Sequence, residues 1–227
     1  MNKILLEITN LKKKYDHLNK SITLFDNFNI NIKEGDLVAV VGPSGSGKSS
    51  LLHLLALLDD PSKGKIVLNN QETKNLSESD KNKLKQTIVS IIFQDNNLLT
   101  DFTAIENVMM PLIIRGENKT TVTEKAEKIL NNVKIFNRSN HFPNELSGGE
   151  QQRVAIARSL INNPDLILAD EMTGNLDENT AKEIFSFFIK YVKENKKSLI
   201  YVTHNNNFAN KANNIFKFKN SNLILMK

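Results

Sequence analysis

The segment from Gly42 to Ser49 constrains the fold more than any other part of this sequence. It reads Gly-Pro-Ser-Gly-Ser-Gly-Lys-Ser and fits the pattern G-x-x-x-x-G-K-[ST]. The chain has only nine glycines in 227 residues and three of them lie here, which argues against a chance match. An apolar run, Leu37–Val41, precedes the segment, and a helical pattern over Lys48–Leu58 follows it. This strand–loop–helix order predicts a phosphate-binding loop and disfavours an ordinary glycine-rich turn.

The residue types in this loop suit the phosphates of a nucleotide. Small residues let consecutive backbone N–H groups surround an anion, and the following helix adds the positive end of its dipole. Lys48 is expected to reach the β- and γ-phosphates, and Ser49 to ligate Mg²⁺. The predicted nucleotide-binding residues of the loop are Gly42, Pro43, Ser44, Gly45, Ser46, Gly47, Lys48, Ser49 and Ser50.

A second apolar strand, Leu166–Ala169, ends in two acids, Asp170 and Glu171. Neighbouring strand residues point to opposite faces of a sheet, so the two carboxylates can have different functions. Asp170 is expected to hold Mg²⁺ through water, and Glu171 to orient or deprotonate the water that attacks the γ-phosphate. The alternative is that both acids only cap the next segment, and the phosphate-binding loop argues against it.

The composition suits a folded domain and excludes several chemistries. Hydrophobic residues make up 40% of the chain and charged residues 24%, which is typical of a globular domain with a sizeable core. The absence of Cys excludes disulfides, thiolate catalysis and cysteine-based zinc sites. The four histidines lie far apart in sequence, without the i, i+4 pair that would suggest a metal site.

The basic charge balance does not indicate a nucleic-acid partner. The net charge is +5 and the pI about 9.2, but only four of the 30 basic residues are Arg, and most lysines are scattered among acids. We therefore expect no nucleic-acid partner. The longest apolar stretch, Leu51–Leu58, is far shorter than the ~20 residues that a membrane-spanning helix needs, so we expect a soluble chain.

Strand and helix patterns alternate along the chain, apart from one long helical block. This order predicts an α/β fold with a mainly parallel sheet. Strand signals stop between Gln94 and Ser147, where a capping box at Thr103 and Glu106 opens a helix, so an α-helical insertion is expected. The predicted strands are 28–32, 37–41, 65–68, 88–93, 166–169 and 199–202, and the predicted helices are 48–58, 121–133 and 181–193.

A third motif, Ser147-Gly-Gly-Glu150, stands at the start of another apolar-periodic helix. Its hydroxyl, its unhindered N–H groups and the helix dipole can together bind an anion. Taken by itself, an ordinary helix N-cap is the simpler interpretation.

Together, the loop, the Asp170–Glu171 pair and Leu146-Ser-Gly-Gly-Glu150 make the chain resemble the nucleotide-binding subunits of ATP-binding-cassette (ABC) transporters. The resemblance implies the P-loop NTPase fold of ABC ATPases: a mainly parallel sheet, an N-terminal antiparallel β region and an inserted α-helical subdomain. It implies a single domain over residues 1–227, with a nucleotide-binding core at 1–94 and 160–227 and a helical subdomain at about 95–159.

The resemblance also assigns roles to single residues. Tyr15 matches the aromatic residue that stacks on adenine, Gln94 the glutamine that contacts Mg²⁺ and senses the membrane partner, and His204 the histidine at the γ-phosphate. Asn175–Asp177 matches the loop that communicates across a dimer. The expected cofactors are ATP and Mg²⁺. The expected catalytic residues are Glu171, His204 and Lys48, the metal ligands Ser49, Gln94 and Asp170, and the further nucleotide contacts Ser147, Gly148, Gly149 and Glu150.

Within the family, the chain is most similar to the ATP-binding subunits of lipoprotein-releasing transporters. The residues that carry this likeness are Leu98–Leu112, Glu145–Arg158, Asn162–Pro164 and Thr173–Asp177. ATPases of macrolide or peptide exporters and of the cell-division ABC complex share much of the pattern and stay as alternatives. ABC proteins that act on DNA or ribosomes carry long coiled coils or two cassettes per chain, and this sequence shows one cassette and no sustained heptads.

The resemblance finally implies partners and a location. A second copy is expected to join head to tail around ATP, and integral membrane subunits to dock near Asp95–Arg115. The chain would then work as a peripheral motor subunit on the cytoplasmic face of the inner membrane. One departure from the family is Met172, which stands where Pro usually follows the catalytic Glu, and a less rigid loop is expected there.

Overall fold

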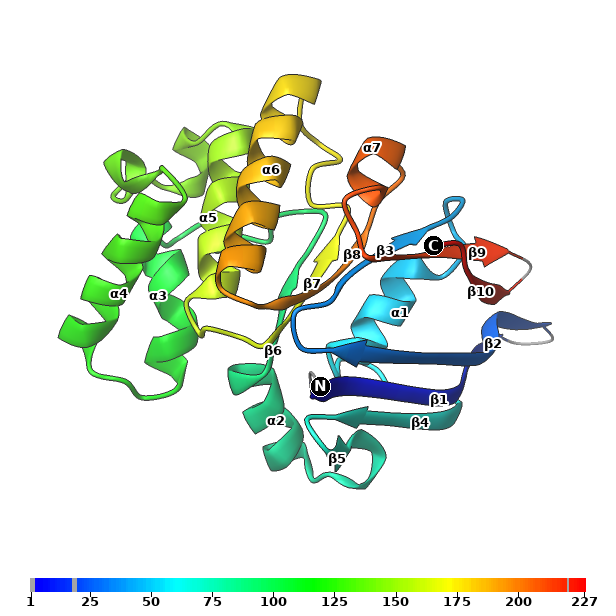
Figure 1. Cartoon of the computed structure of the whole chain (residues 1–227). Helices are drawn as coiled ribbons and strands as arrows, with labels where there is room; N and C mark the ends of the chain where they lie inside the picture. Colours follow the sequence, from blue (N-terminus) through cyan, green and yellow to red (C-terminus); the bar gives the residue numbers. More distant parts are fainter. Residues whose placement is uncertain (1–2, 18–19, 220) are drawn as a thin grey trace.

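A computed structural model describes residues 3–17, 20–219 and 221–227, and its strands form two sheets (Figure 1). The larger sheet has the order β10-β9-β3-β8-β7-β6. Its neighbours pair in parallel except for β9 and β10, so helices must cross over between consecutive strands. Its strands are β3 (Leu37–Val41), β6 (Val89–Ile92), β7 (Leu166–Asp170), β8 (Ser198–Val202), β9 (Asn214–Lys219) and β10 (Asn222–Leu225).

The smaller sheet is antiparallel, with the order β2-β1-β4-β5. Its strands are β1 (Ile4–His17), β2 (Lys20–Lys33), β4 (Lys63–Leu68) and β5 (Gln71–Glu72). The alternation of Phe28, Ile30 and Ile32 with Asn, which predicted a half-buried strand, lies in β2, and both Phe28 and Ile32 are buried. The pairing of β1 with β4 is irregular between Thr9 and Lys12, where Asn10 has a φ of 51°.

Seven α-helices are described: α1 (Lys48–Leu55), α2 (Glu78–Thr87), α3 (Ala104–Ile114), α4 (Lys119–Asn132), α5 (Gly148–Leu160), α6 (Glu178–Glu194) and α7 (Asn206–Ala209). Short 3₁₀ turns lie at Thr73–Asn75, Phe136–Arg138 and Pro143–Glu145. The predicted capping box of α3 is confirmed, with the Thr103 N–H donating to Glu106 Oε2 over 2.9 Å. The predicted helix over 48–58 is shorter in the structure, because the chain leaves helical geometry after Leu55 and Leu57 adopts a φ of 57°.

The large sheet separates two hydrophobic cores. One face, with Leu37 and Ala39, packs against the helical layer of α3 to α6. The other face, with Val38 and Val40, packs against α1 and the antiparallel sheet. Figure 1 shows α3, α4 and α5 gathered at one side of the molecule and β1, β2 and β4 at the other. The predicted α/β architecture with its antiparallel region and helical insertion is confirmed.

None of the helices among the described residues is long and apolar enough to span a bilayer.

Candidate functional site

Four of the predicted segments meet at the carboxyl-terminal edge of the parallel strands. Val40 of β3 pairs with Val202 of β8, and Val202 also pairs with Asp170 of β7. Ile92 of β6 pairs with Ala169 of β7. The register therefore brings Gly42–Ser50, Asp170–Glu171, His204 and Gln94 to one edge, although they are far apart in sequence. In open α/β sheets this edge is the usual ligand-binding position.

The predicted phosphate-binding loop has a backbone that favours glycine. Gly45 and Gly47 have φ angles of 74° and 98°, in the left-handed region. A Cβ on Gly47 would also lie 3.2 Å from the Cβ of Leu24 in β2, so the loop packs closely against the antiparallel sheet. Gly47 is the N-cap of α1 and offers no side-chain cap. The first N–H groups of α1 are consequently left for another acceptor.

The Lys48 ammonium is buried inside this loop. The residue is 6% exposed, and its Nζ donates to the carbonyl oxygens of Gly42 over 3.1 Å and Pro43 over 2.9 Å. Across the described part of the chain, no carboxylate forms an ion pair with it. An ammonium has three N–H donors, so one remains. A buried cation beside uncapped helix N–H groups makes a site for an anion.

Asp170 lies beside this loop and is 6% exposed. Burial raises the pKa of its carboxyl above the ordinary value, and the nearby Glu171 carboxylate adds to the rise. A hydrogen bond with Ser49 and the charges of His53 and Lys48 oppose it. A buried carboxylate next to a hydroxyl is an oxygen donor set of the kind that Mg²⁺ prefers, with phosphate oxygens and water completing the shell. The described residues contain no group of three or more His, Asp or Glu side chains that could hold a metal ion by themselves.

Glu171 and His204 are neighbours at the same edge. His204 Nδ1 lies 3.2 Å from Glu171 Oε2, with the His204 side chain exposed and the Glu171 side chain mostly buried. Glu171 has a φ of 40°, which is unusual for a residue with a side chain. Its backbone is held by the Val202 carbonyl, which accepts from the Glu171 N–H over 3.2 Å, and by the Gly174 N–H, which donates to its carbonyl over 2.7 Å. A cavity of about 220 Å³ opens beside this pair.

Met172, which departs from the family pattern, is buried in the core beside the helical layer. The expectation of a less rigid loop stays a prediction.

Gln94 is exposed, two residues beyond the end of β6. The loop that follows is held by Arg158 of α5, whose guanidinium donates over 2.7 Å to the carbonyls of both Asn96 and Asn97. Asn175 also reaches this loop, with Nδ2 3.4 Å from Asp95 Oδ1. Sequence patterns did not single out Arg158 for this contact, because nothing local links α5 to the loop after β6.

Ser147–Glu150 forms the predicted N-terminus of α5, and the structure explains its geometry by capping alone. The Glu150 N–H donates to Ser147 Oγ, and Glu150 Oε2 accepts from the Ser147 N–H over 2.8 Å. These contacts and Arg138, whose Nε donates to Glu150 over 3.0 Å, lower the pKa of Glu150 despite its partial burial. No hydrogen bond or ion pair between described residues joins this segment to the Gly42–Ser50 loop of the same chain.

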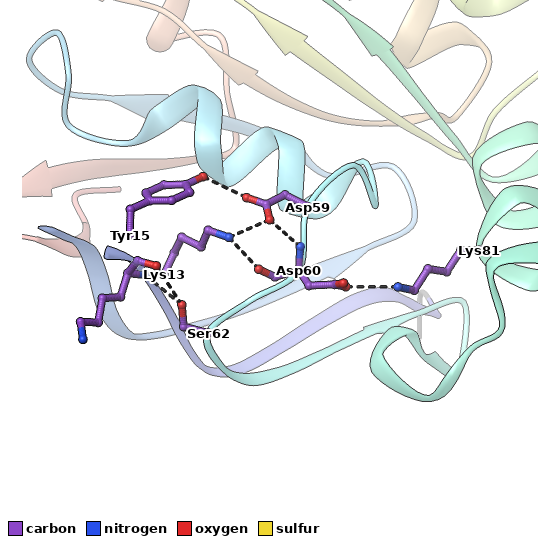
Figure 2. Close-up of polar contacts among 7 residues, drawn as sticks. Lys13, Tyr15, Asp59, Asp60, Ser62 and Lys81 are labelled. Carbon is purple, nitrogen blue, oxygen red and sulfur yellow. Dashed lines mark hydrogen bonds and ion pairs between the residues drawn. The ribbon is translucent and has the colours of Figure 1, made fainter. Parts of the chain in front are cut away.

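Tyr15 lies away from the strand edge, on β1, where it pairs with Ile22 of β2. The side chain of Leu24, two residues further along β2, contacts the phosphate-binding loop at Gly47. Tyr15 is therefore near the loop but makes its polar contacts elsewhere. Its hydroxyl donates to Asp59 Oδ2 over 2.9 Å, and Lys13 Nζ lies 4.7 Å from the centre of its ring (Figure 2). Neither Lys13 nor Asp59 was predicted from the sequence.

Comparisons with known proteins agree with this geometry. Residues 25–174 match the ABC transporter family. The lipoprotein-releasing system ATP-binding protein LolD of Rickettsia bellii is 44% identical over 98% of this chain and 99% of its own. The LolD protein of Ehrlichia chaffeensis is 46% identical over 92% of this chain and 89% of its own.

Among solved structures, the dimeric ATP-binding cassette MJ0796 bound to ADP and Pi superposes with a TM-score of 0.91 at 36% identity, covering 98% of each chain. A second dimeric structure of MJ0796, described as a bacterial ABC transporter cassette, also gives a TM-score of 0.91, at 37% identity. The fold, the site at the strand edge and these relatives together place the chain in the ABC transporter family, as one of its ATP-binding cassettes.

Proposed function

We propose that this protein is the ATP-hydrolysing motor subunit of a lipoprotein-releasing ABC transporter. The observation that carries the ATP-binding part is the Lys48 ammonium, which is buried at the N-terminus of α1 with two carbonyl partners and, within the described chain, no carboxylate partner. Such a cation needs an anion, and the uncapped N–H groups at the start of α1 favour an anion such as a phosphate. The transported substrate is inferred from the names of the LolD relatives.

In this proposal the phosphates of ATP lie in the Gly42–Ser50 loop. The N–H groups of the loop and of the first turn of α1 donate to phosphate oxygens, and Lys48 donates its remaining N–H to the β- and γ-phosphates. Ser49, Asp170 and Gln94 would hold Mg²⁺. When bound, that ion neutralises phosphate charge and orients the γ-phosphate.

Glu171 is the residue proposed to activate water. Its carboxylate accepts a proton from the water molecule, whose oxygen then bonds to the γ-phosphorus as the bond to the bridging β–γ oxygen breaks. ADP leaves with that oxygen, and the remainder leaves as inorganic phosphate. His204 is exposed and adjacent, so its ring can turn from Glu171 toward a γ-phosphate oxygen and stabilise the charge there.

A second copy is proposed to complete each site. Ser147–Gly149 offers a hydroxyl and helix N–H groups, but in its own chain it is joined to the phosphate-binding loop by no described hydrogen bond. In a head-to-tail dimer with twofold symmetry, the Ser147 segment of each copy faces the nucleotide of the other, giving two identical composite sites. The dimeric MJ0796 cassettes have the same fold, which supports this arrangement.

The membrane subunits are proposed to dock on the helical layer between Asp95 and Arg115, at the cytoplasmic face of the inner membrane. This region leaves four large apolar side chains exposed: Leu99, Phe102, Ile113 and Ile114. Val108 and Met109 are buried in the core of the helical layer and do not belong to this exposed surface, whereas Met110 is half-buried. The loop after Gln94 adjoins this surface, which would let docking and the nucleotide site influence each other.

The nucleotide part of the proposal is tested by calorimetric titration of the purified chain with ATP and Mg²⁺. Lys48→Ala should abolish measurable binding. Lys197→Ala is the matched control, because Lys197 is also largely buried but pairs with Asp165 on another side of the molecule. Equal binding by Lys48→Ala and wild type would refute the assignment of the loop.

The transport part is tested by co-purification from detergent-solubilised membranes, with mass spectrometry of the bound subunits. Recovery of the membrane subunits of a lipoprotein-releasing transporter supports the proposal, and recovery of those of a macrolide exporter or of the division complex overturns it. Ile114→Glu should abolish recovery, whereas Ile224→Glu, an exposed apolar position on β10, should not.

A further inference from the structure

A compact polar cluster surrounds Tyr15, outside the strand-edge site. It consists of Lys13 and Tyr15 on β1, of Asp59 and Asp60 in the segment after α1, and of Lys81 on α2 (Figure 2). None of these contacts involves the predicted phosphate-binding loop, Gly42–Ser50. The cluster connects β1, the segment after α1 and α2, which raises the question of what it positions.

Lys13 is the centre of the cluster. It is 6% exposed, and its Nζ donates to Asp59 Oδ1 over 2.7 Å and to the Asp60 carbonyl over 2.8 Å. Two of its three N–H donors are thus used, and the ammonium also lies 4.7 Å from the centre of the Tyr15 ring. One face of the ring therefore carries a cation, so a flat ligand can stack only on the opposite face.

Asp59 holds the other end of the ring. Its Oδ1 accepts from Lys13 and from the Asp60 N–H, and its Oδ2 accepts from the Tyr15 hydroxyl over 2.9 Å. Partial burial alone would raise the pKa of the Asp59 carboxyl, but the hydrogen bonds from Lys13, Tyr15 and Asp60 hold it below the ordinary value. The carboxylate is charged at neutral pH, and the Tyr15 hydroxyl meets a strong acceptor.

The ring of Tyr15 is consequently fixed at three points although the residue is 44% exposed. Its Cβ is set by strand pairing with Ile22, its hydroxyl by Asp59 and one face by Lys13. Asp60 is itself tied to α2 by Lys81, with Nζ 3.2 Å from Oδ1, so the acceptor segment is also anchored. An exposed aromatic ring that is so constrained loses little entropy when a ligand stacks on it.

We propose that Lys13 and Asp59 are positioning residues that orient Tyr15 for stacking on the adenine base. This inference rests on the proposed ATP-binding function and on the stacking role that the family resemblance predicts for Tyr15. We further infer that stacking of the adenine base contributes fully to nucleotide affinity only when the Lys13–Asp59 pair holds the Tyr15 ring in place. Removing the pair should weaken the binding of a nucleotide and spare the binding of its phosphates.

The experiment compares two probes by calorimetry with the full chain and Mg²⁺: the non-hydrolysable ATP analogue adenylyl imidodiphosphate, and inorganic tripolyphosphate, which lacks the nucleoside. Asp59→Ala and Tyr15→Phe should each weaken the binding of the analogue by about three- to tenfold, as expected for the net contribution of one typical hydrogen bond, and leave the binding of tripolyphosphate unchanged. The double variant should bind the analogue only slightly more weakly than the weaker-binding single variant, because both changes remove the same hydrogen bond.

Tyr15→Phe keeps the Lys13–Asp59 ion pair, so it also guards against a trivial loss of folding in Asp59→Ala. The matched control is Asp26→Ala, which breaks the neighbouring Lys12–Asp26 pair without touching Tyr15 and should change neither affinity. Tyr15→Ala distinguishes the stacking role of Tyr15 from the positioning role of Lys13 and Asp59. If it weakens only the analogue while Tyr15→Phe and Asp59→Ala do not, the stacking role stands and the positioning role is overturned. If Tyr15→Ala itself changes nothing, the adenine platform proposed for Tyr15 fails, and the positioning role fails with it.

Discussion

His204 Nδ1 and Glu171 Oε2 lie 3.2 Å apart, across the ends of the adjacent strands β8 and β7. The contact joins an exposed imidazole to a mostly buried carboxylate whose backbone has a left-handed φ. The Glu171 backbone is thus held by hydrogen bonds through both its N–H and its carbonyl, whereas the His204 side chain is exposed. We expect the carboxylate to stay in place during hydrolysis and the imidazole to move toward the γ-phosphate.

Replacing Glu171 by Gln should block hydrolysis and spare binding. The amide keeps the shape of the carboxylate but cannot accept a proton from water, so kcat should fall about 10²–10⁴-fold, as for the loss of a general base. The measurement is phosphate release by the complex assembled with its membrane subunits, with ATP affinity determined in parallel. Glu194→Gln is the control, because Glu194 is exposed and pairs with Lys190 at the end of α6, away from the cavity beside Glu171. Turnover by Glu171→Gln at close to the wild-type rate would remove Glu171 from the mechanism.

Replacing Asp170 by Asn should stabilise the nucleotide-free chain. Burial raises the pKa of Asp170 in the folded state. The folded protein therefore loses stability as pH rises from the unfolded-state pKa, about 3.9, through the raised folded value, and Asn avoids that loss. At neutral pH we expect a gain of about 1 kcal/mol, or about 2–4 °C in Tm for a chain of this length. Thermal melts at pH 4 and pH 7.5 measure it, and the gain should shrink at the lower pH.

Asp177→Asn is the control, because the pKa of Asp177 is shifted in the direction opposite to that of Asp170. Hydrogen bonds from Thr180 at the start of α6 lower the pKa of Asp177, so its stabilising effect is present above the unfolded-state pKa and lost as pH falls through the folded one. The Asn variant should not gain stability at neutral pH. If Asp170→Asn melts no higher than wild type at pH 7.5, the Asp170 carboxyl carries no burial penalty.

Mixing two inactive variants should restore activity if the site is shared between copies. Lys48→Ala damages the loop, and Ser147→Ala damages the segment proposed to complete the partner's site. A mixed dimer contains one intact composite site and one site with both defects. Phosphate release by the mixture should exceed that of either variant alone. The composite-site proposal would be falsified if complexes shown to contain both variants stayed as inactive as the separate ones.

Gly64→Ala should destabilise the fold strongly, because a Cβ there would lie 2.3 Å from the Asn10 carbonyl oxygen in the irregular part of β1. We expect a loss of at least about 3 kcal/mol from overpacking and from the left-handed φ together. Gly116→Ala is a close match, since Gly116 also has a positive φ but no atom within 4 Å of the added Cβ. The Gly116→Ala change should lower the free energy of unfolding by about 1 kcal/mol. Urea unfolding monitored by circular dichroism compares them, and equal losses would contradict the close approach of β4 to β1.

Local sequence signals predicted the elements that depend on neighbouring residues. The glycine-rich loop, the apolar strands β3, β7 and β8, and the capped starts of α3 and α5 lie close to where their patterns placed them. Each is set by short-range geometry: backbone conformations open to glycine, side chains that cap helix N–H groups, and runs that must be buried on both faces. The two acids after β7 could be paired with the loop because parallel strands end at one edge.

Long-range contacts determine the features of the fold and the site that local sequence patterns did not predict. Lys13 belongs to the basic run Lys12–Lys14, yet it is buried, because it pairs with Asp59 from the segment after α1. The α2 helix was not predicted, since only Leu84 in it is buried and no apolar stripe marks it. A sequence pattern reports the average environment of a segment, whereas an ion pair or a hydrogen bond depends on atoms that folding alone brings within about 3 Å. The order of strands in the sheets and the fixed ring of Tyr15 therefore follow from tertiary packing.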